Sequence, residues 1–147
     1  MQQPIVISGA GILGCYISCA LSLQGIDSIV LEKKDDEVED SVRTITLNPF
    51  SKNLLDKIGI ENDYSMINKM EVKDFDGTGK IVFKSSEIGM DHLAYVSDFA
   101  TLLMAIRKKA SDKILYKEEI ININNKGDLN EVTLSSGKII KTNLIIS

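Results

Sequence analysis

The sequence predicts an α/β fold that opens with a strand, a helix and a second strand, and three observations support this. Residues 4–8 form an apolar run of the kind that buried strands have. Residues 12–24 place apolar side chains at helical spacing and stop before Gly25, a typical signal for a helix C-terminus. Residues 28–32 form a second apolar run that ends on an acidic side chain. This order predicts a βαβ unit.

A glycine-rich turn joins the first apolar run to the helix, and its spacing is that of a dinucleotide-binding fingerprint. We expect Gly9 to permit the tight turn, Gly11 to let the backbone approach a pyrophosphate, and Gly14 to let helix and strand pack closely. The free N–H groups at the helix start would face the phosphates. Glu32 would accept hydrogen bonds from an adenosine ribose and disfavour the 2′-phosphate of NADP. The alternative is a glycine turn in some other βαβ fold.

Length and composition are those of one ordinary globular domain. The chain has 147 residues, of which 44% are hydrophobic and 26% charged. Its net charge of −4 argues against a nucleic-acid-binding surface. No apolar stretch approaches the roughly 20 residues that span a bilayer, although peripheral association with a membrane stays open. The N-terminus also lacks the pattern of a signal peptide, so we expect a cytoplasmic protein.

The cysteines and the single histidine do not predict a metal site or a catalytic triad. Cys15 and Cys19 lie on the first predicted helix, and no second Cys/His pair exists that would complete a zinc site. His92 has only Asp91 beside it as a polar partner in the sequence. We therefore assign no metal and no catalytic role to these residues.

After the βαβ unit, a charged loop over residues 33–40 leads to a second helix. That helix begins at Asn48, which is followed by a proline at the first helical position, and ends before Gly59. Residues 70–76 and 80–85 are separated by a glycine-rich turn and predict a β-hairpin.

An extended segment over residues 93–96 precedes Ser97, which we expect to cap a third helix over residues 98–110. The remainder predicts a β-meander of short strands followed by a final apolar strand, with expected ranges 113–117, 119–123, 131–135, 138–141 and 143–147. Because no turn, cap or polar tail follows the last strand, we expect the domain to be incomplete.

With these segments, the sequence resembles the N-terminal part of the FAD-dependent ubiquinone-biosynthesis hydroxylases. They belong to the wider class of single-component aromatic hydroxylases that includes p-hydroxybenzoate hydroxylase. Beyond the glycine fingerprint, Arg43 opens a segment similar to the family's Arg-x-x-Ala-Leu-Ser, and Tyr95 and Val96 are similar to its Tyr-Val-x-Glu-Asn. The other similar segments cover residues 51–55, 70–74, 87–94 and 144–146.

The resemblance implies a Rossmann-like FAD-binding domain, in which residues 70–96 form an excursion that contributes to the sheet of a substrate domain. It implies FAD as cofactor, NAD(P)H as transient reductant, and a phenolic or quinone-precursor substrate, but it assigns no catalytic residue. It places Arg43 near the FAD pyrophosphate or ribose, and Asp98 at an acidic position of the cofactor site. The alternatives are a surface arginine for Arg43 and a first-turn carboxylate for Asp98.

The chain also departs from the family pattern. Phe99 and Ala100 replace the Asn and Arg of the family's Glu-Asn-Arg, and the later Gly-Ala-Asp-Gly and Gly-Asp-Ala motifs are not in this sequence. We therefore expect the chain not to hydroxylate by itself, and to associate with itself or with a C-terminal half through its hairpin. A non-catalytic nucleotide-binding remnant or a split-subunit interaction module is the alternative. An NAD-binding dehydrogenase domain is a third and weaker hypothesis.

Overall fold

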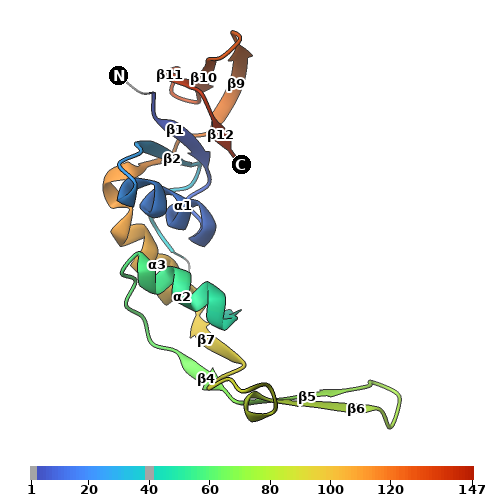
Figure 1. Cartoon of the computed structure of the whole chain (residues 1–147). Helices are drawn as coiled ribbons and strands as arrows, with labels where there is room; N and C mark the ends of the chain where they lie inside the picture. Colours follow the sequence, from blue (N-terminus) through green and yellow to red (C-terminus); the bar gives the residue numbers. More distant parts are fainter. Residues whose placement is uncertain (1–2, 39–41) are drawn as a thin grey trace. The chain divides into compact units, whose positions relative to one another are not determined.

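The computed structural model describes residues 3–38 and 42–147, and it divides into two compact units. Within the described residues, the first unit contains residues 3–38 and 102–147, and the second contains residues 42–101. Figure 1 shows both units coloured along the chain. The last two residues of the expected charged loop, 39 and 40, lie outside the described residues. Each unit is described by itself.

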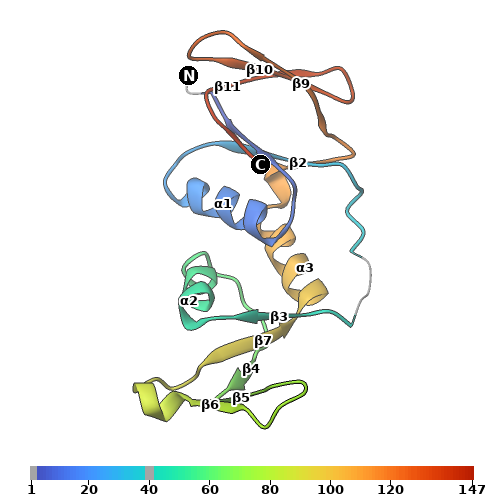
Figure 2. The same cartoon turned by 90° about the vertical axis from the view of Figure 1, so that its right-hand side faces the viewer.

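A parallel sheet of four strands forms the centre of the first unit. Its order is β12-β1-β2-β8, and every neighbouring pair is parallel. The helix α1 (Ile12–Leu23) connects β1 to β2 and packs against both strands, as Figure 2 shows. The predicted βαβ unit is therefore confirmed. The strand bounds are β1 (Ile5–Ser8), β2 (Ser28–Glu32), β8 (Ile114–Tyr116) and β12 (Ile145–Ile146).

The contact between α1 and β2 contains a buried polar pair as well as apolar side chains. The hydroxyl groups of Ser18 and Ser28 lie 2.8 Å apart and form a hydrogen bond, which satisfies both groups where water has no access. Cys15 is fully buried in the same helix, and burial raises the pKa of its thiol to about 11. This thiol therefore stays protonated and unreactive at neutral pH.

The C-terminal strands form an antiparallel three-stranded meander, but the first strand expected in it, over residues 113–117, is β8 of the parallel sheet, where it pairs with β2. The order of the meander is β11-β10-β9, with β9 (Ile120–Asn125), β10 (Asn130–Leu134) and β11 (Ile139–Thr142). Val132 and Leu134 are fully buried and join one apolar cluster with Val6 and Leu31 of the parallel sheet. The meander and the parallel sheet thus share a core inside the first unit.

The second unit is built on a small antiparallel sheet with a helix. The sheet order is β3-β7-β4, with β3 (Thr44–Leu47), β4 (Ser65–Ile67) and β7 (Ala94–Asp98). The helix α2 (Pro49–Lys57) begins as predicted, because the side chain of Asn48 accepts a hydrogen bond of 2.7 Å from the N–H of Ser51. The sequence did not predict β3 or β4.

The predicted hairpin is present in the second unit with shorter strands than expected. It consists of β5 (Lys69–Lys73) and β6 (Lys80–Lys84), visible as the long two-stranded ribbon in Figure 1. Val72 pairs with Ile81 and Met70 with Phe83, so these apolar side chains share one face. Val72 and Ile81 are more than half exposed.

The helix α3 (Phe99–Lys109) begins in the second unit, and its residues from 102 onward belong to the first. The expectation that Ser97 caps this helix was wrong. Asp98 is the cap, since its carboxylate accepts a hydrogen bond of 2.7 Å from the N–H of Thr101. Ser97 instead lies within β7, where its hydroxyl accepts a hydrogen bond from the side-chain amide of Asn62.

Two single-turn 3-10 helices complete the description, η1 (Ser85–Ile88) and η2 (Ser111–Lys113). Across residues 3–38 and 42–147, the structure contains no helix with both the length and the apolar character that crossing a membrane requires.

Candidate functional site

The candidate site lies where β1 ends and α1 begins. Gly9 has φ +102°, a left-handed backbone conformation that side chains other than glycine rarely adopt. Its N–H donates to the carbonyl of Leu31 at 2.7 Å, which ties the turn to the neighbouring strand β2. The turn is therefore fixed by both its backbone conformation and its hydrogen bonding.

Gly14 is required by packing rather than by backbone conformation. A Cβ at this position would overlap the carbonyl oxygen of Gly9 and lie 3.4 Å from Cγ2 of Ile7. Any side chain would therefore push the first turn of α1 away from β1 and from the glycine turn.

Gly11 differs from the other two glycines, because neither constraint applies to it. It is the N-cap of α1 with φ −75° and ψ 179°, a conformation open to all residues. A Cβ built on Gly11 meets nothing within 4 Å. Nothing in the described protein therefore explains a glycine here, whereas a ligand in close approach to the backbone does.

The first turn of α1 presents unpaired backbone donors. The first hydrogen bond of the helix runs from the N–H of Cys15 to the carbonyl of Gly11, so the N–H groups of residues 12–14 have no acceptor within the helix. Gly11 provides no side-chain cap, and the first turn contains no acidic residue. The partial positive charge at the start of this 12-residue helix is thus not neutralised by its own side chains.

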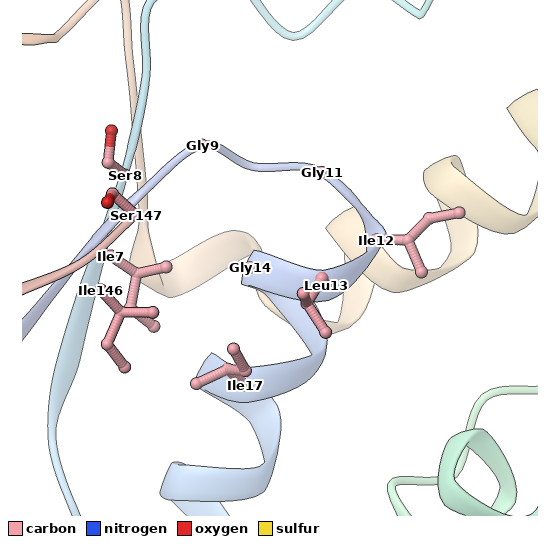
Figure 3. Close-up of a pocket in the computed structure, with 10 residues that line it drawn as sticks. All are labelled: Ile7, Ser8, Gly9, Gly11, Ile12, Leu13, Gly14, Ile17, Ile146 and Ser147. Atoms are coloured by element: carbon pink, nitrogen blue, oxygen red, sulfur yellow. The ribbon is translucent and has the colours of Figure 1, made fainter. Parts of the chain in front are cut away.

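A cavity of about 350 Å³ opens beside this turn. Figure 3 shows the chain leaving β1 at Ser8, arching through Gly9 and Gly11, and entering the helix at Ile12, with Gly14 in its first turn. The cavity wall combines the backbone of this arch with apolar side chains of β1, α1 and β12. The lining residues outside the glycines are Ile7, Ser8, Ile12, Leu13, Ile17, Ile146 and Ser147.

The carboxylate of Glu32 lies next to the glycine turn. Its Oε2 accepts a hydrogen bond of 3.0 Å from the N–H of Ala10, the residue between Gly9 and Gly11. Its Oε1 accepts one of 3.1 Å from the N–H of Lys34. The fold thus brings Glu32 and the three fingerprint glycines together at the ends of β1 and β2.

Sequence reasoning missed Arg107, which also contacts the turn. Its Nε donates to the carbonyl of Ala10 at 2.8 Å, and its Nη2 lies 3.4 Å from Oε2 of Glu32. The side chain is only 11% exposed, and its guanidinium lies 5.7 Å from the ring centroid of Tyr116. An arginine in the last turn of a helix usually serves the helix dipole, so the sequence alone offers no signal for this contact.

Arg43 and Asp98, the other two predicted site residues, belong to the second unit. The exposed guanidinium of Arg43 stacks over the ring of Phe99, 4.2 Å from its centroid. The carboxylate of Asp98 caps α3, and its hydrogen bonds, chiefly from the N–H of Thr101, hold its pKa below the usual range. Both side chains have local structural partners, and the charged end of Arg43 stays accessible.

A second cavity, of about 430 Å³, lies within the second unit and includes Asp98 in its wall. The hydroxyl of Tyr64 is buried there with no hydrogen-bond partner among the described residues. His92, to which the sequence assigned no role, hydrogen-bonds Asn68 at 2.7 Å and packs edge-on against Tyr95.

The model of a family described as FAD binding domain matches residues 2–134. Ubiquinone biosynthesis monooxygenase COQ6 from Danio rerio is 26% identical over 170 aligned positions, which cover 97% of this chain and 35% of that protein. The chain therefore spans about a third of the length of this relative.

Two solved structures show the same fold at low identity. One is p-nitrophenol 4-monooxygenase PnpA from Pseudomonas putida, with a TM-score of 0.77 and 16% identity over 98% of this chain and 40% of that one. The other is HpxO from Klebsiella pneumoniae, complexed with FAD and uric acid, with a TM-score of 0.73 and 20% identity over 97% and 38%.

Proposed function

The chain belongs to the family of FAD binding domains, and from that premise we propose that it is the FAD-binding portion of a NAD(P)H-dependent aromatic-ring monooxygenase. FAD is the cofactor of this family. The observation that carries the residue assignment is Gly11, whose conformation does not require glycine and whose Cβ would point into open space at an uncapped helix start. That space fits a pyrophosphate against the backbone.

In this proposal the fingerprint residues hold the adenosine and pyrophosphate half of FAD. Gly9 and Gly14 keep the turn tight, and the N–H groups of residues 12–14 donate to phosphate oxygens. Glu32 accepts a hydrogen bond from the adenosine ribose. When bound, FAD supplies the redox chemistry, while the protein supplies binding, orientation and exclusion of water.

Arg43 is proposed to add a cation near the pyrophosphate. Arg43 is an exposed residue whose guanidinium carbon lies 4.2 Å from the centroid of the Phe99 ring, and guanidinium N–H groups suit phosphate oxygens. Asp98 of the same unit is a second candidate for a contact with FAD. Its role as the cap of α3 is the simpler explanation for an acidic residue at this position.

The substrate class rests on the relatives. COQ6 is named as a monooxygenase of ubiquinone biosynthesis and PnpA as a p-nitrophenol monooxygenase, which supports a phenolic or quinone-precursor ring as substrate. The hairpin β5–β6 lies in the excursion over residues 70–96 that is proposed to contribute to a substrate domain. Its exposed apolar face fits this proposal, because further strands of that domain could cover it. No residue of this chain is assigned to catalysis.

A non-catalytic nucleotide-binding module is the second candidate, and one observation favours it. The residues that the first unit brings together, Gly9, Gly11, Gly14 and Glu32, are all proposed for the nucleotide half of FAD and none for the flavin ring. A domain with these contacts binds adenine nucleotides whether or not a flavin reaction follows.

Calorimetric titration of the purified chain with FAD, ADP and NADP⁺ tests both candidates. The monooxygenase proposal expects FAD to bind and NADP⁺ to bind much more weakly, since Glu32 repels a 2′-phosphate. NAD(P)H consumption is then followed with bound FAD, oxygen and a panel of alkylphenols. NAD(P)H oxidation by the FAD complex favours the monooxygenase portion over the nucleotide-binding module, and a hydroxylated ring product would contradict the expectation that the chain does not hydroxylate by itself. Absence of FAD binding contradicts the residue assignments.

A further inference from the structure

Arg107 and Glu32 bind the same residue of the glycine turn from two sides. The N–H of Ala10 donates to Oε2 of Glu32 at 3.0 Å, while the carbonyl of Ala10 accepts from Nε of Arg107 at 2.8 Å. The ring closes where Nη2 of Arg107 lies 3.4 Å from the same Oε2. Both polar groups of the Ala10 main chain are therefore fixed by two oppositely charged side chains.

This ring is shielded from solvent. Ala10 is fully buried, and the side chains of Arg107 and Glu32 are 11% and 13% exposed. In such surroundings a pair of charges is weakly screened, and hydrogen bonds between ionised groups hold their geometry well. The ring thus differs from the exposed ion pairs elsewhere in this chain, such as Lys52 with Asp56.

The ring also decides which oxygen of Glu32 is free for a ligand. A carboxylate oxygen has about two acceptor sites. On Oε2 both are used, by Ala10 and Arg107, whereas Oε1 has one donor, the N–H of Lys34. A ribose hydroxyl that approaches Glu32 therefore finds its free acceptor site on Oε1.

We propose that Arg107 is a positioning residue of the nucleotide site: it fixes Oε2 of Glu32 and the carbonyl of Ala10, so that Oε1 faces the ribose and Gly11 faces the pyrophosphate. This inference rests on the proposed nucleotide-binding function, and it assigns no direct contact between Arg107 and the ligand. Its role differs from that of Arg43, whose charged group is exposed. Lys cannot replace Arg107 fully, because one ammonium group does not reproduce two divergent N–H donors.

The test measures the dissociation constant of ADP for the whole chain and for Arg107→Met, with Lys108→Met as the matched control. Lys108 is exposed on the same helix, so this variant removes one charge and leaves the ring intact. We expect Arg107→Met to weaken ADP binding about tenfold and Lys108→Met to leave it unchanged. Parental ADP affinity in Arg107→Met would overturn the inference. Absence of ADP and FAD binding by the parent chain would instead contradict the proposed function.

A double-mutant cycle separates positioning from direct contact. If Arg107 acts through Glu32, then Arg107→Met has little further effect on ADP affinity in a Glu32→Ala background. Fully multiplicative losses would show that Arg107 acts independently of Glu32, and would overturn its role in fixing Oε2.

Hydrogen exchange of the chain without ligand supplies a readout that does not depend on binding. We expect Arg107→Met to speed exchange of the Ala10 amide, with no change at Val30 in the centre of the parallel sheet. Equal acceleration at both amides would indicate a general loss of stability and count against a positioning role. If Arg107→Met does not fold, Arg107→Lys replaces it. We then expect the ADP affinity of Arg107→Lys to be lower than that of the parent chain, and an affinity equal to the parent's contradicts the inference.

Discussion

At the residue scale, Glu32 is the side chain for which we propose a role in both the fold and the ligand site. Oε2 holds the glycine turn through Ala10, and Oε1 is the oxygen with acceptor capacity to spare. Replacement of Glu32 therefore leaves the guanidinium of Arg107 without its carboxylate and, in the proposed site, also removes an acceptor for the ribose.

We expect Glu32→Ala to lower FAD affinity roughly ten- to a hundredfold, because hydrogen bonds to a charged group contribute about 1.5–3 kcal/mol. Calorimetric titration of the folded variant measures this. We also expect a lower melting temperature, since a buried guanidinium loses its counter-charge. Unchanged FAD affinity would remove Glu32 from the cofactor site.

Gly11→Val tests the pyrophosphate cradle. The new side chain meets no protein atom within 4 Å at its Cβ, so we expect the circular dichroism spectrum of the chain to be preserved and FAD binding to be lost. Gly79→Val is the control, since Gly79 lies in the hairpin turn and its Cβ would make only ordinary contacts. A Gly11→Val protein that binds FAD as the parent does would show that the turn holds no phosphate.

Gly14→Ala is expected to have the opposite signature. Its methyl group would overlap the carbonyl of Gly9, and overpacking of this kind costs about 1–3 kcal/mol of unfolding free energy. Urea denaturation of the chain without ligand measures the loss. A variant as stable as the parent would mean that α1 shifts away from β1 without cost.

At the scale of elements, the segments that the sequence predicts best are those with local signals. The βαβ unit, α2 and the hairpin are each marked by apolar periodicity and by Gly, Asn or Pro at their ends. The strands β3 and β4 were missed because they are short, mostly exposed, and paired only through the distant β7. Arg107 was missed for the same reason, since its partners Ala10 and Glu32 lie 97 and 75 residues away.

The start of α3 provides a prediction at this scale. Asp98→Ala should lower the melting temperature at neutral pH, because the N–H of Thr101 loses its acceptor. The pKa of Asp98 is lowered in the folded chain, so its contribution is complete above the unfolded-state pKa, about 4, and is lost as the pH falls through the lower folded-state pKa.

Thermal melts of the parent chain and Asp98→Ala between pH 7 and pH 3 test this. The difference in melting temperature should shrink toward the acid end. If the difference is independent of pH, the carboxylate charge has no part in the cap. If the free energy of FAD binding falls by more in Asp98→Ala than the free energy of unfolding does, the cofactor role is favoured for this residue.

At the scale of the whole molecule, the residues proposed for cofactor binding are divided between the two units, so each unit is tested by itself. The fingerprint glycines and Glu32 belong to the first unit, and Arg43 and Asp98 to the second. A unit whose residues bind the ligand is protected from local opening, because each opening event then costs the binding free energy as well.

We therefore expect saturating FAD to slow amide hydrogen exchange around residues 9–14 of the first unit and, if Arg43 and Asp98 bind FAD as proposed, around residues 43 and 99–101 of the second unit. At a ligand concentration of 100 times the dissociation constant, this added protection corresponds to about 2.7 kcal/mol. Riboflavin, which lacks the pyrophosphate and adenosine, should protect residues 9–14 far less and serves as the control. Protection by FAD that is confined to the first unit would remove Arg43 and Asp98 from the cofactor site, and would leave the glycine turn, Glu32 and Arg107 as its nucleotide-binding part.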